Sequence, residues 1–219
     1  MIDSLQVSVV IPVFNEELVL HKFYPRLKKE AESWGKSYEI LFVDDGSTDN
    51  SLELICKWKK VDSNIRVIKF TRNFGQQAAV LAGFRESRGN IVVQIDSDLQ
   101  NPPEEIKRLL DAFTDEIDLV VTTPRKRRDS SLRIIGSKAL HFLAQALFGN
   151  RFKLNLSSFR AMRRSVIEKI DQCQDRSRYM AVLMSWMAVP TVNVEVDHHS
   201  RKIGQTKYGV LPLLRLTWD

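Results

Sequence analysis

Short apolar runs alternate with segments of helical spacing over the first 120 residues of the chain. The runs are rich in β-branched residues and lie at 6–13, 38–43, 65–70, 90–95 and 117–122. Between them, apolar residues recur at helical spacing over 16–34, 49–61, 75–88 and 103–113. Strand–helix–strand order at this rhythm indicates βαβ units, in which strands pair in parallel and helices cover both faces of the sheet. The sequence therefore predicts an α/β fold with a mainly parallel central sheet.

The chain is predicted to form a single domain with a basic C-terminal extension. Its 219 residues are 43% hydrophobic and 27% charged, which is ordinary for a globular protein and argues against a disordered or fibrous chain. The two cysteines, Cys56 and Cys173, are too few for a disulfide framework and indicate reduced thiols in a cytosolic protein. The sequence holds no run of 18 uninterrupted apolar residues, so no segment of it is predicted to span a bilayer.

Charge is distributed unevenly along the chain. Residues 1–119 carry 15 Lys and Arg against 20 Asp and Glu, whereas residues 120–219 carry 18 against 7. The acidic part is suited to hold a cation, and the basic part is suited to bind phosphate or an anionic surface. Solvated surface charge without a specific role is the alternative. The basic loop Arg125–Arg128 alone also fits non-specific attraction to nucleic acid or anionic lipid, and we expect no specific nucleic-acid partner.

Polar segments follow four of the predicted strands, at the point where each strand ends. They lie at 13–17, 43–51, 72–76 and 96–104. In open parallel sheets, ligands bind outside the carboxyl ends of the strands. We therefore expect these four segments to share one edge of the sheet and to form one site.

Asp96 and Asp98 directly follow the fourth predicted strand, and Gln100 comes two residues later. Two carboxylates at this spacing can present oxygens to one hard divalent cation, such as Mg²⁺, which completes its coordination with water and substrate phosphates. A nucleotide sugar needs such charge neutralisation when its diphosphate leaves. The alternative is a turn in which the aspartates only cap the backbone.

Asp44 and Asp45 follow the second predicted strand, and Gly46 permits a tight turn after them. A carboxylate at this edge can accept hydrogen bonds from a nucleobase, while residues 47–49 cap the next helix. No P-loop and no GxGxxG pattern is present, which weighs against a phosphate-cradling ATPase or a dinucleotide enzyme.

Four segments together resemble a known enzyme family, in order and in spacing. They are VSVVIPVFNEE, ILFVDDGSTDNS, NFGQQAAVLAGF and DSDLQNPPEEI. The chain resembles glycosyltransferase family 2 of the Rossmann-like GT-A fold. Within it, the similarity is to the branch of dolichyl-phosphate mannose synthase and bacterial polyprenyl-phosphate glycosyltransferases, including the one that moves a formamido-arabinose sugar. The segment HHSRKIGQTKY resembles the basic motif that precedes the membrane-associated helices of this branch.

The resemblance implies a role for each residue that matches the family's motifs. The residues implied to line the nucleotide are Pro12, Val13, Asn15, Glu16, Asp44 and Asp45. Those implied to hold Mg²⁺ or Mn²⁺ are Asp96, Asp98 and Gln100. Those implied to face the acceptor phosphate are Arg125, Arg133 and Ser137, and those implied to close over the donor diphosphate are Arg201 and Lys207.

Two segments depart from the family's pattern. Relatives often read Asp-x-x-Ser-Gly-Phe-Arg where this chain has Leu154–Arg160, so the acidic position is missing and Asn155 is its candidate replacement. Many relatives also have tyrosine after the IP of the first motif, where this chain reads Val13 and Phe14, which removes a hydroxyl from the nucleotide pocket.

The expected activity is inverting transfer of a sugar from a nucleotide diphosphate to a polyprenyl phosphate, undecaprenyl or dolichyl. Such an acceptor needs no general base, because its phosphate is mostly a dianion at neutral pH. Residues 1–122 would bind the donor and residues 123–219 the acceptor, with a homo-oligomer left open. The amphipathic segment 132–148 and the apolar tail 208–219 indicate work at an anionic membrane, on its cytoplasmic side. We expect further, membrane-associated sequence after residue 219.

Two rival functions remain open. A family 2 transferase that glycosylates a polysaccharide hydroxyl would need a base, and the sequence shows no additional carboxylate beside the acceptor loop. A non-catalytic module that binds anionic membrane or nucleic acid would be favoured by loss of Asp96 or Asp98, and both are present.

Overall fold

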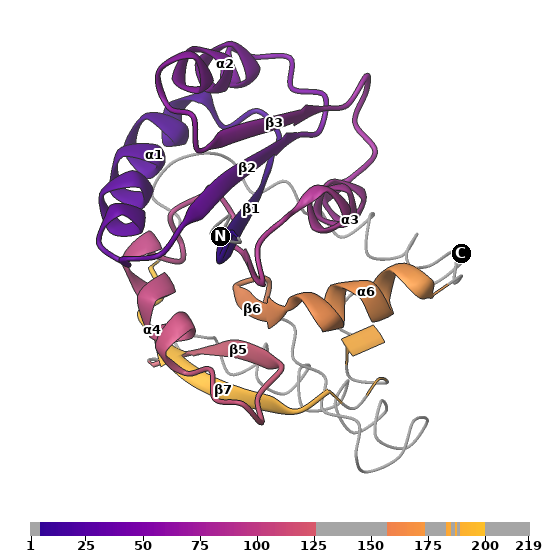
Figure 1. Cartoon of the computed structure of the whole chain (residues 1–219). Helices are drawn as coiled ribbons and strands as arrows, with labels where there is room; N and C mark the ends of the chain where they lie inside the picture. The colour runs from indigo at the N-terminus through magenta and orange to yellow at the C-terminus, as the bar shows by residue number, and fades with distance from the viewer. Residues whose placement is uncertain (1–4, 126–156, 174–182, 185–186, 188, 200–219) are drawn as a thin grey trace, which may run out of the picture.

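The computed structural model describes residues 5–125, 157–173, 183–184, 187 and 189–199 (Figure 1). Its strands are β1 (Val7–Val13), β2 (Tyr38–Asp44), β3 (Ile65–Lys69), β4 (Ile91–Gln94), β5 (Leu119–Pro124), β6 (Arg160–Arg163) and β7 (Thr191–Val196). Its helices are α1 (Glu17–Glu32), α2 (Ser51–Val61), α3 (Gln76–Glu86), α4 (Ile106–Asp111), α6 (Arg164–Gln172) and the short 3-10 helix η1 (Pro103–Glu105). Among the described residues, no helix is long and apolar enough to cross a membrane.

The described strands form one sheet of seven in the order β3-β2-β1-β4-β6-β5-β7. Neighbouring strands are parallel except at β6, which runs antiparallel to both β4 and β5. Every residue of β1 is buried, as expected of a central strand covered on both faces. The predicted α/β fold with a mainly parallel sheet is thereby confirmed.

Helices cover both faces of the sheet (Figure 1). Successive strand residues point to opposite faces. Ile11 of β1 belongs to a core cluster with residues of α1, α2 and α4. Val10, the preceding residue, belongs to a second cluster with residues of α3 and α6. Both clusters include residues of β5 and β6. These two strands, which follow residue 118, therefore pack into the same two clusters as β1.

The strand β6 was not predicted from the sequence. It is four residues long, reads RAMR and begins and ends with arginine, so it lacks the apolar run that marks the other strands. Its partners β4 and β5 lie far from it in sequence. The amphipathic segment 132–148 and the basic extension 200–219 lie outside the described residues.

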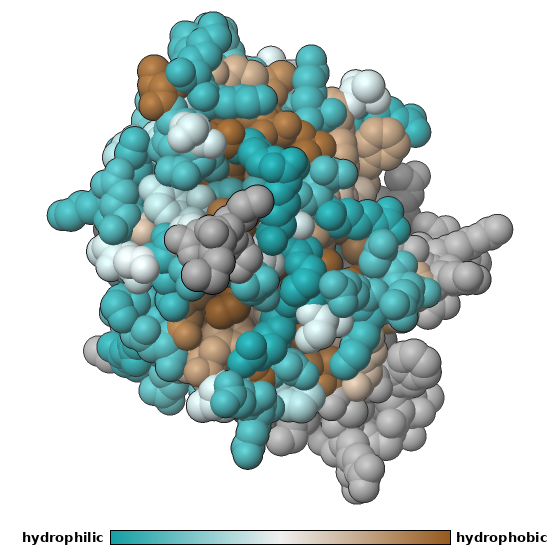
Figure 2. Space-filling view, in the orientation of Figure 1, coloured by the Kyte–Doolittle hydropathy of each residue, from teal (hydrophilic) through white to brown (hydrophobic). Residues whose placement is uncertain are grey.

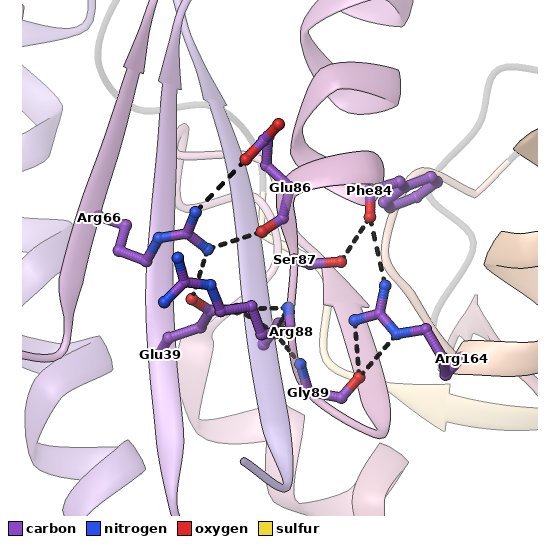
Figure 3. Close-up of polar contacts among 9 residues, drawn as sticks. Glu39, Arg66, Phe84, Glu86, Ser87, Arg88, Gly89 and Arg164 are labelled. Atoms are coloured by element: carbon purple, nitrogen blue, oxygen red, sulfur yellow. Dashed lines mark hydrogen bonds and ion pairs between the residues drawn. The ribbon is translucent and has the colours of Figure 1, made fainter. Parts of the chain in front are cut away.

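A polar network ties the turn between α3 and β4 to the amino ends of β1 and β2 (Figure 3). The buried carboxylate of Glu39 accepts hydrogen bonds from Ser8 Oγ at 2.5 Å, Arg66 Nη1 at 2.9 Å and the Arg88 backbone N–H at 2.7 Å. The same turn receives the side chain of Arg164, whose Nη2 donates to the Gly89 carbonyl at 2.7 Å. These contacts fix the end of the sheet opposite to the polar segments described above.

The face shown in Figure 2 is mainly hydrophilic, and apolar side chains reach it in small areas. Among the described residues, the exposed large hydrophobic side chains are Leu18, Val61 and Phe74. Phe74 differs from the other two because it lies in the loop between β3 and α3, at the edge where the polar segments gather.

Candidate active site

The polar segments that follow β1, β2, β3 and β4 meet at one edge of the sheet, as the sequence predicts. β4 pairs with β1 on the side opposite to β2, so the order of strands reverses between β1 and β4. The carboxyl ends of strands at such a reversal are where α/β sheets bind ligands. The antiparallel strand β6 brings its amino end to the same edge, since Arg160 lies opposite Gln94 in β4.

The loop after β1 is held against the loop after β2. Asn15 has a φ of 54°, a conformation that asparagine tolerates better than most residues. Its Oδ1 accepts the N–H of Thr48 at 2.8 Å, and its own N–H donates to Ser47 Oγ at 3.0 Å. The next residue, Glu16, donates its N–H to Ser51 Oγ at 2.9 Å. These bonds fix the backbone of the predicted nucleotide-binding loop.

Pro12 and Val13, also predicted to line the nucleotide, are buried residues of β1. Asn15 and Glu16 are only partly buried. The side chains of Asn15 and Glu16 are therefore accessible at this edge, whereas Pro12 and Val13 are buried in the sheet.

Asp44 and Asp45 are both buried and hydrogen-bonded to backbone. Asp44 Oδ2 accepts the N–H of Ser47 at 3.2 Å, while its buried Oδ1 has no hydrogen-bond partner among the described residues. Asp45 accepts the N–H of Phe74 at 2.7 Å and that of Gly75 at 3.0 Å. The Asp45 carboxylate thus joins the end of β2 to the loop that leads into α3.

Gly46 allows this loop to approach closely. Its φ is +72°, and a Cβ atom on it would lie 2.5 Å from the backbone carbon of Arg72. Arg72 in turn holds its guanidinium 4.8 Å from the centre of the Phe74 ring, a cation–π contact. A side chain at position 46 would push apart the two loops that follow β2 and β3.

Asp96 is the most strongly engaged of the predicted metal ligands. Its Oδ1 accepts from Gln76 Nε2 at 2.7 Å, and its Oδ2 accepts from Ser158 Oγ at 2.6 Å. Burial raises the pKa of the Asp96 carboxyl above its ordinary value, and the nearby charge of Asp98 adds to the rise. The hydrogen bonds from Ser158 and Gln76 act in the opposite direction, because they stabilise the anion.

Asp98 and Gln100 form a tight turn next to Asp96. Asp98 Oδ1 accepts the N–H of Gln100 at 3.0 Å, and Leu99 between them has a φ of 60°. The Gln100 carbonyl accepts the N–H of His199 at 2.8 Å, which ties the segment after β7 to this turn. Asp98 therefore does cap the backbone of this turn, which was the alternative to metal binding. Its carboxylate is nevertheless partly exposed.

The residues at this turn fit a divalent cation. Asp96 and Asp98 supply carboxylate oxygens whose negative charges repel one another, and a cation would relieve both that repulsion and the cost of burying Asp96. Within the described parts of the chain, no group of three or more His, Cys, Asp and Glu side chains could hold a metal. Mg²⁺ is usually bound by one or two carboxylates, and substrate phosphates and water complete its coordination shell.

Of the residues predicted to face the acceptor, Arg125 is described. It is exposed at the end of β5, and its Nη1 lies 3.3 Å from Oδ1 of Asp197, just after β7. The prediction that no additional carboxylate lies beside the acceptor loop is wrong for Asp197, which reaches Arg125 because β5 and β7 are parallel neighbours. Arg133, Ser137, Arg201 and Lys207 lie outside the described residues.

Two residues at the site were not singled out from the sequence. Gln76 belongs to a polar segment that was noted only as a whole, and Ser158 belongs to the segment Leu154–Arg160, which was noted only as a departure from the family's pattern. Ser158 lies 62 residues after Asp96, and their contact depends on the pairing of β6 with β4, which was not predicted.

A mainly parallel α/β sheet with carboxylates and amide groups gathered where its strand order reverses has the arrangement at which α/β proteins bind ligands. The chain belongs to glycosyltransferase family 2: the profile described as "Glycosyl transferase family 2" matches residues 8–171. It is therefore a glycosyltransferase.

Curated relatives give the same assignment. The chain is 39% identical over 218 residues to the undecaprenyl-phosphate 4-deoxy-4-formamido-L-arabinose transferase of Aeromonas hydrophila subsp. hydrophila, covering 99% of this chain and 67% of that protein. It is 39% identical over 215 residues to the protein of the same name from Salmonella paratyphi B, covering 98% and 66%. The chain thus spans about two thirds of the length of these relatives.

Solved structures place the fold among the GT-A glycosyltransferases. The mannosyltransferase PcManGT from Pyrobaculum calidifontis, in complex with GDP-Man and Mn²⁺, matches with a TM-score of 0.64 at 16% identity, over 87% of this chain and 55% of that one. The glucosyl-3-phosphoglycerate synthase of Mycobacterium tuberculosis matches with a TM-score of 0.61 at 21% identity, over 97% and 77%. At these identities the likeness concerns the fold alone.

Proposed function

We propose that the chain is the catalytic domain of a polyprenyl-phosphate glycosyltransferase, with undecaprenyl phosphate as the acceptor and a nucleotide-diphosphate sugar as the donor. The observation that carries the proposal is the Asp96–Asp98 pair at the reversal of strand order, beside the partly buried Asn15 and Glu16. The names of the 39%-identical relatives support the acceptor.

The donor would lie along the carboxyl ends of β1, β2 and β4. Asn15, Glu16, Asp44 and Asp45 form or support the surface for the nucleoside, and the loop that ends at Gly75 is fixed by Asp45. Asp96, Asp98 and Gln100 would hold Mg²⁺ or Mn²⁺, which would neutralise the diphosphate as the sugar leaves. PcManGT was solved with Mn²⁺ and GDP-Man, which supports a metal in the proposal.

The acceptor would approach from the ends of β5 and β7. Its phosphate is mostly a dianion at neutral pH and attacks the anomeric carbon without a general base, which inverts the configuration. Arg125 would orient that phosphate, and its ion pair with Asp197 holds the guanidinium at the edge until an anion replaces the carboxylate. In this arrangement residues 1–122 serve the donor and residues 123–219 the acceptor, within one domain that spans 1–219.

The proposed location is the cytoplasmic face of a cell membrane, where a lipid-linked acceptor keeps its phosphate. The second part of the chain carries 18 basic residues against 7 acidic ones from residue 120 onward, which suits an anionic surface. Arg133, Ser137, Arg201 and Lys207 would add to the acceptor and diphosphate sites as the family resemblance implies.

A second candidate, transfer to a sugar hydroxyl, is favoured by Asp197. Such an acceptor must lose a proton, and in this second proposal the Asp197 carboxylate, which pairs with Arg125, would accept it. Asp197→Asn separates the two functions: transfer to a hydroxyl would fall on the order of 10²-fold or more, while transfer to a lipid phosphate would be largely kept.

The proposed function is tested with nucleoside diphosphates. UDP, GDP and CDP are added to the protein with Mg²⁺, with Mn²⁺ or with a chelator, and thermal unfolding is followed. One of them should raise the melting temperature only with metal, and the sugar nucleotide of the same base should then transfer its sugar to undecaprenyl phosphate. Equal stabilisation in the chelator, or transfer without metal, would contradict the metal assignment.

A further inference from the structure

The carboxylate of Asp96 is held from two sides by elements that are remote in sequence. Gln76, the first residue of α3, donates Nε2 to Oδ1 at 2.7 Å. Ser158, two residues before β6, donates Oγ to Oδ2 at 2.6 Å. Both distances are typical of hydrogen bonds to an ionised acceptor, which are the stronger kind.

Gln76 is mounted on a fixed element. The residue before it, Gly75, has a φ of 95° and gives its N–H to Asp45 Oδ2 at 3.0 Å. Further along α3, Gly83 packs so closely on the sheet that a Cβ atom would lie 2.3 Å from Val10 Cγ1. The start of α3 therefore cannot shift along the sheet without breaking these contacts.

Ser158 is fixed equally well on the other side. Its neighbour Phe159 is fully buried, and the Phe159 carbonyl accepts the hydroxyl of Thr122 in β5 at 2.8 Å. The hydroxyls of Thr122 and Ser157 lie 2.7 Å apart. The backbone around Ser158 is thus anchored to β5 before it enters β6.

We infer that Gln76 and Ser158 are positioning residues that fix the Asp96 carboxylate in the orientation in which it binds the divalent cation of the donor site. The inference rests on the proposed function, which supplies the cation. A carboxylate offers about four lone-pair positions on its two oxygens. One hydrogen bond on each oxygen prevents the group from rotating and leaves positions on both oxygens for a cation.

The two hydrogen bonds also keep the Asp96 carboxylate from turning toward other donors of the protein. Partly buried between α3 and the segment before β6, the carboxylate would otherwise turn toward any nearby donor, and its charge would be poorly compensated. Groups that orient a metal ligand in this way typically change metal affinity by about 10- to 100-fold when they are removed. Neither Gln76 nor Ser158 has to touch the metal or the substrate for this effect.

The test uses two variants and two matched controls. Gln76→Met keeps the length of the side chain but removes the donor to Asp96, and Ser158→Ala removes the hydroxyl. Gln77→Met makes the same chemical change at the next, exposed residue of α3. Ser158→Thr keeps a hydroxyl at the second position.

Mn²⁺ binding is measured by electron paramagnetic resonance on each protein in the presence of UDP and, separately, of GDP. We expect Gln76→Met and Ser158→Ala to weaken Mn²⁺ binding by about 10- to 100-fold. Gln77→Met should match the parent, and Ser158→Thr should recover most of the loss. The melting temperature of each metal-free variant should stay within a few degrees of the parent, because the role is orientation and not folding.

Three results would overturn the inference, and one of them would also overturn the proposed function. If the parent binds Mn²⁺ with a nucleoside diphosphate and both variants bind it equally well, only the positioning role is wrong. If the parent itself binds no Mn²⁺ with either nucleotide, the metal-dependent function and the positioning role are both wrong. A loss of metal-free stability that accounts for the loss of Mn²⁺ binding would make the two residues structural and would also overturn the inference.

Discussion

The carboxylate of Asp45 accepts the backbone N–H of Gly75 at 3.0 Å and thereby joins the end of β2 to the start of α3. Its second oxygen accepts the N–H of Phe74 at 2.7 Å, and the side chain is 2% exposed. The sequence suggested Asp45 as a contact to the nucleobase. In the structure its oxygens support the loop from which Gln76 reaches Asp96, so its effect on donor binding is expected to pass through that loop.

Asp45→Asn should therefore destabilise the fold as well as weaken nucleotide binding. An amide is neutral and offers only one acceptor oxygen, so both N–H groups lose a charged partner and one of them loses its acceptor, at a cost of about 1.5–3 kcal/mol. Urea denaturation measures the loss, and hydrogen exchange at Phe74 and Gly75 should become faster. Asp111→Asn, which removes an exposed pair with Lys107, is the control and should cost less than about 0.5 kcal/mol. Equal costs at the two positions would contradict the supporting role.

Glu39 provides a prediction for the opposite end of the sheet. Its carboxylate is buried and accepts from Ser8, Arg66 and the Arg88 backbone, so Glu39→Gln leaves part of this network without a charged partner (Figure 3). We expect a loss of about 2–3 kcal/mol in the free energy of unfolding. Nucleotide affinity should stay unchanged, because the network lies at the amino ends of the strands.

The matched control for this prediction is Glu86→Gln. Glu86 pairs with the same Arg66 at 3.5 Å, but its side chain is 61% exposed, and a pair of that kind contributes less than about 1 kcal/mol. Urea denaturation of both variants, with nucleotide binding measured on the folded proteins, makes the comparison. A weaker affinity for nucleotide in Glu39→Gln would show that the two ends of the sheet are coupled.

The fold could be predicted further than the site. The strands β1 to β5 carry short apolar runs rich in β-branched residues, and this is why they were found within two residues of their bounds. The strand β6 was missed because a strand of four residues with two arginines carries no such signal. The aspartates at the end of β4 were found from local spacing, whereas Ser158 meets Asp96 only through the pairing of β6 with β4, which no local pattern encodes.

Asp62 gives a pH-dependent prediction. Burial by itself would raise its pKa, but hydrogen bonds from Tyr24 at 2.8 Å and from the Asn64 N–H at 2.9 Å, together with Lys28 at 3.1 Å, lower the pKa below its ordinary value. A carboxyl whose pKa is lowered by folding stabilises the protein above its unfolded pKa, about 3.9, and this contribution is lost as the pH falls through the folded pKa.

The experiment compares the parent with Asp62→Asn by urea denaturation from pH 7 to pH 2. The difference in the free energy of unfolding should be constant above about pH 5 and should shrink steadily below about pH 4, because the parent alone loses the charge that Tyr24 and Lys28 stabilise. Glu53→Gln, an exposed residue paired with Lys57, serves as the control and should show a much smaller difference at neutral pH. A difference for Asp62→Asn that does not change with pH would contradict the lowered pKa.

Reversible binding to anionic membranes is expected because the basic residues are concentrated in the second part of the chain, at 18 Lys and Arg against 7 Asp and Glu after residue 119. Each basic residue near an anionic leaflet gains about 1 kcal/mol, so several together can hold the domain at the surface where a lipid phosphate would meet Arg125.

Co-sedimentation with vesicles that contain phosphatidylglycerol should weaken as salt shortens the screening length from about 10 Å at 0.1 M to about 3 Å at 1 M. Removal of residues 208–219 should reduce binding further if that apolar segment inserts, and should leave it unchanged if the segment packs against the domain. Neutral vesicles and high salt both weaken the attraction of an anionic leaflet for arginine and lysine. Binding that is equally strong under both conditions would therefore exclude an electrostatic origin.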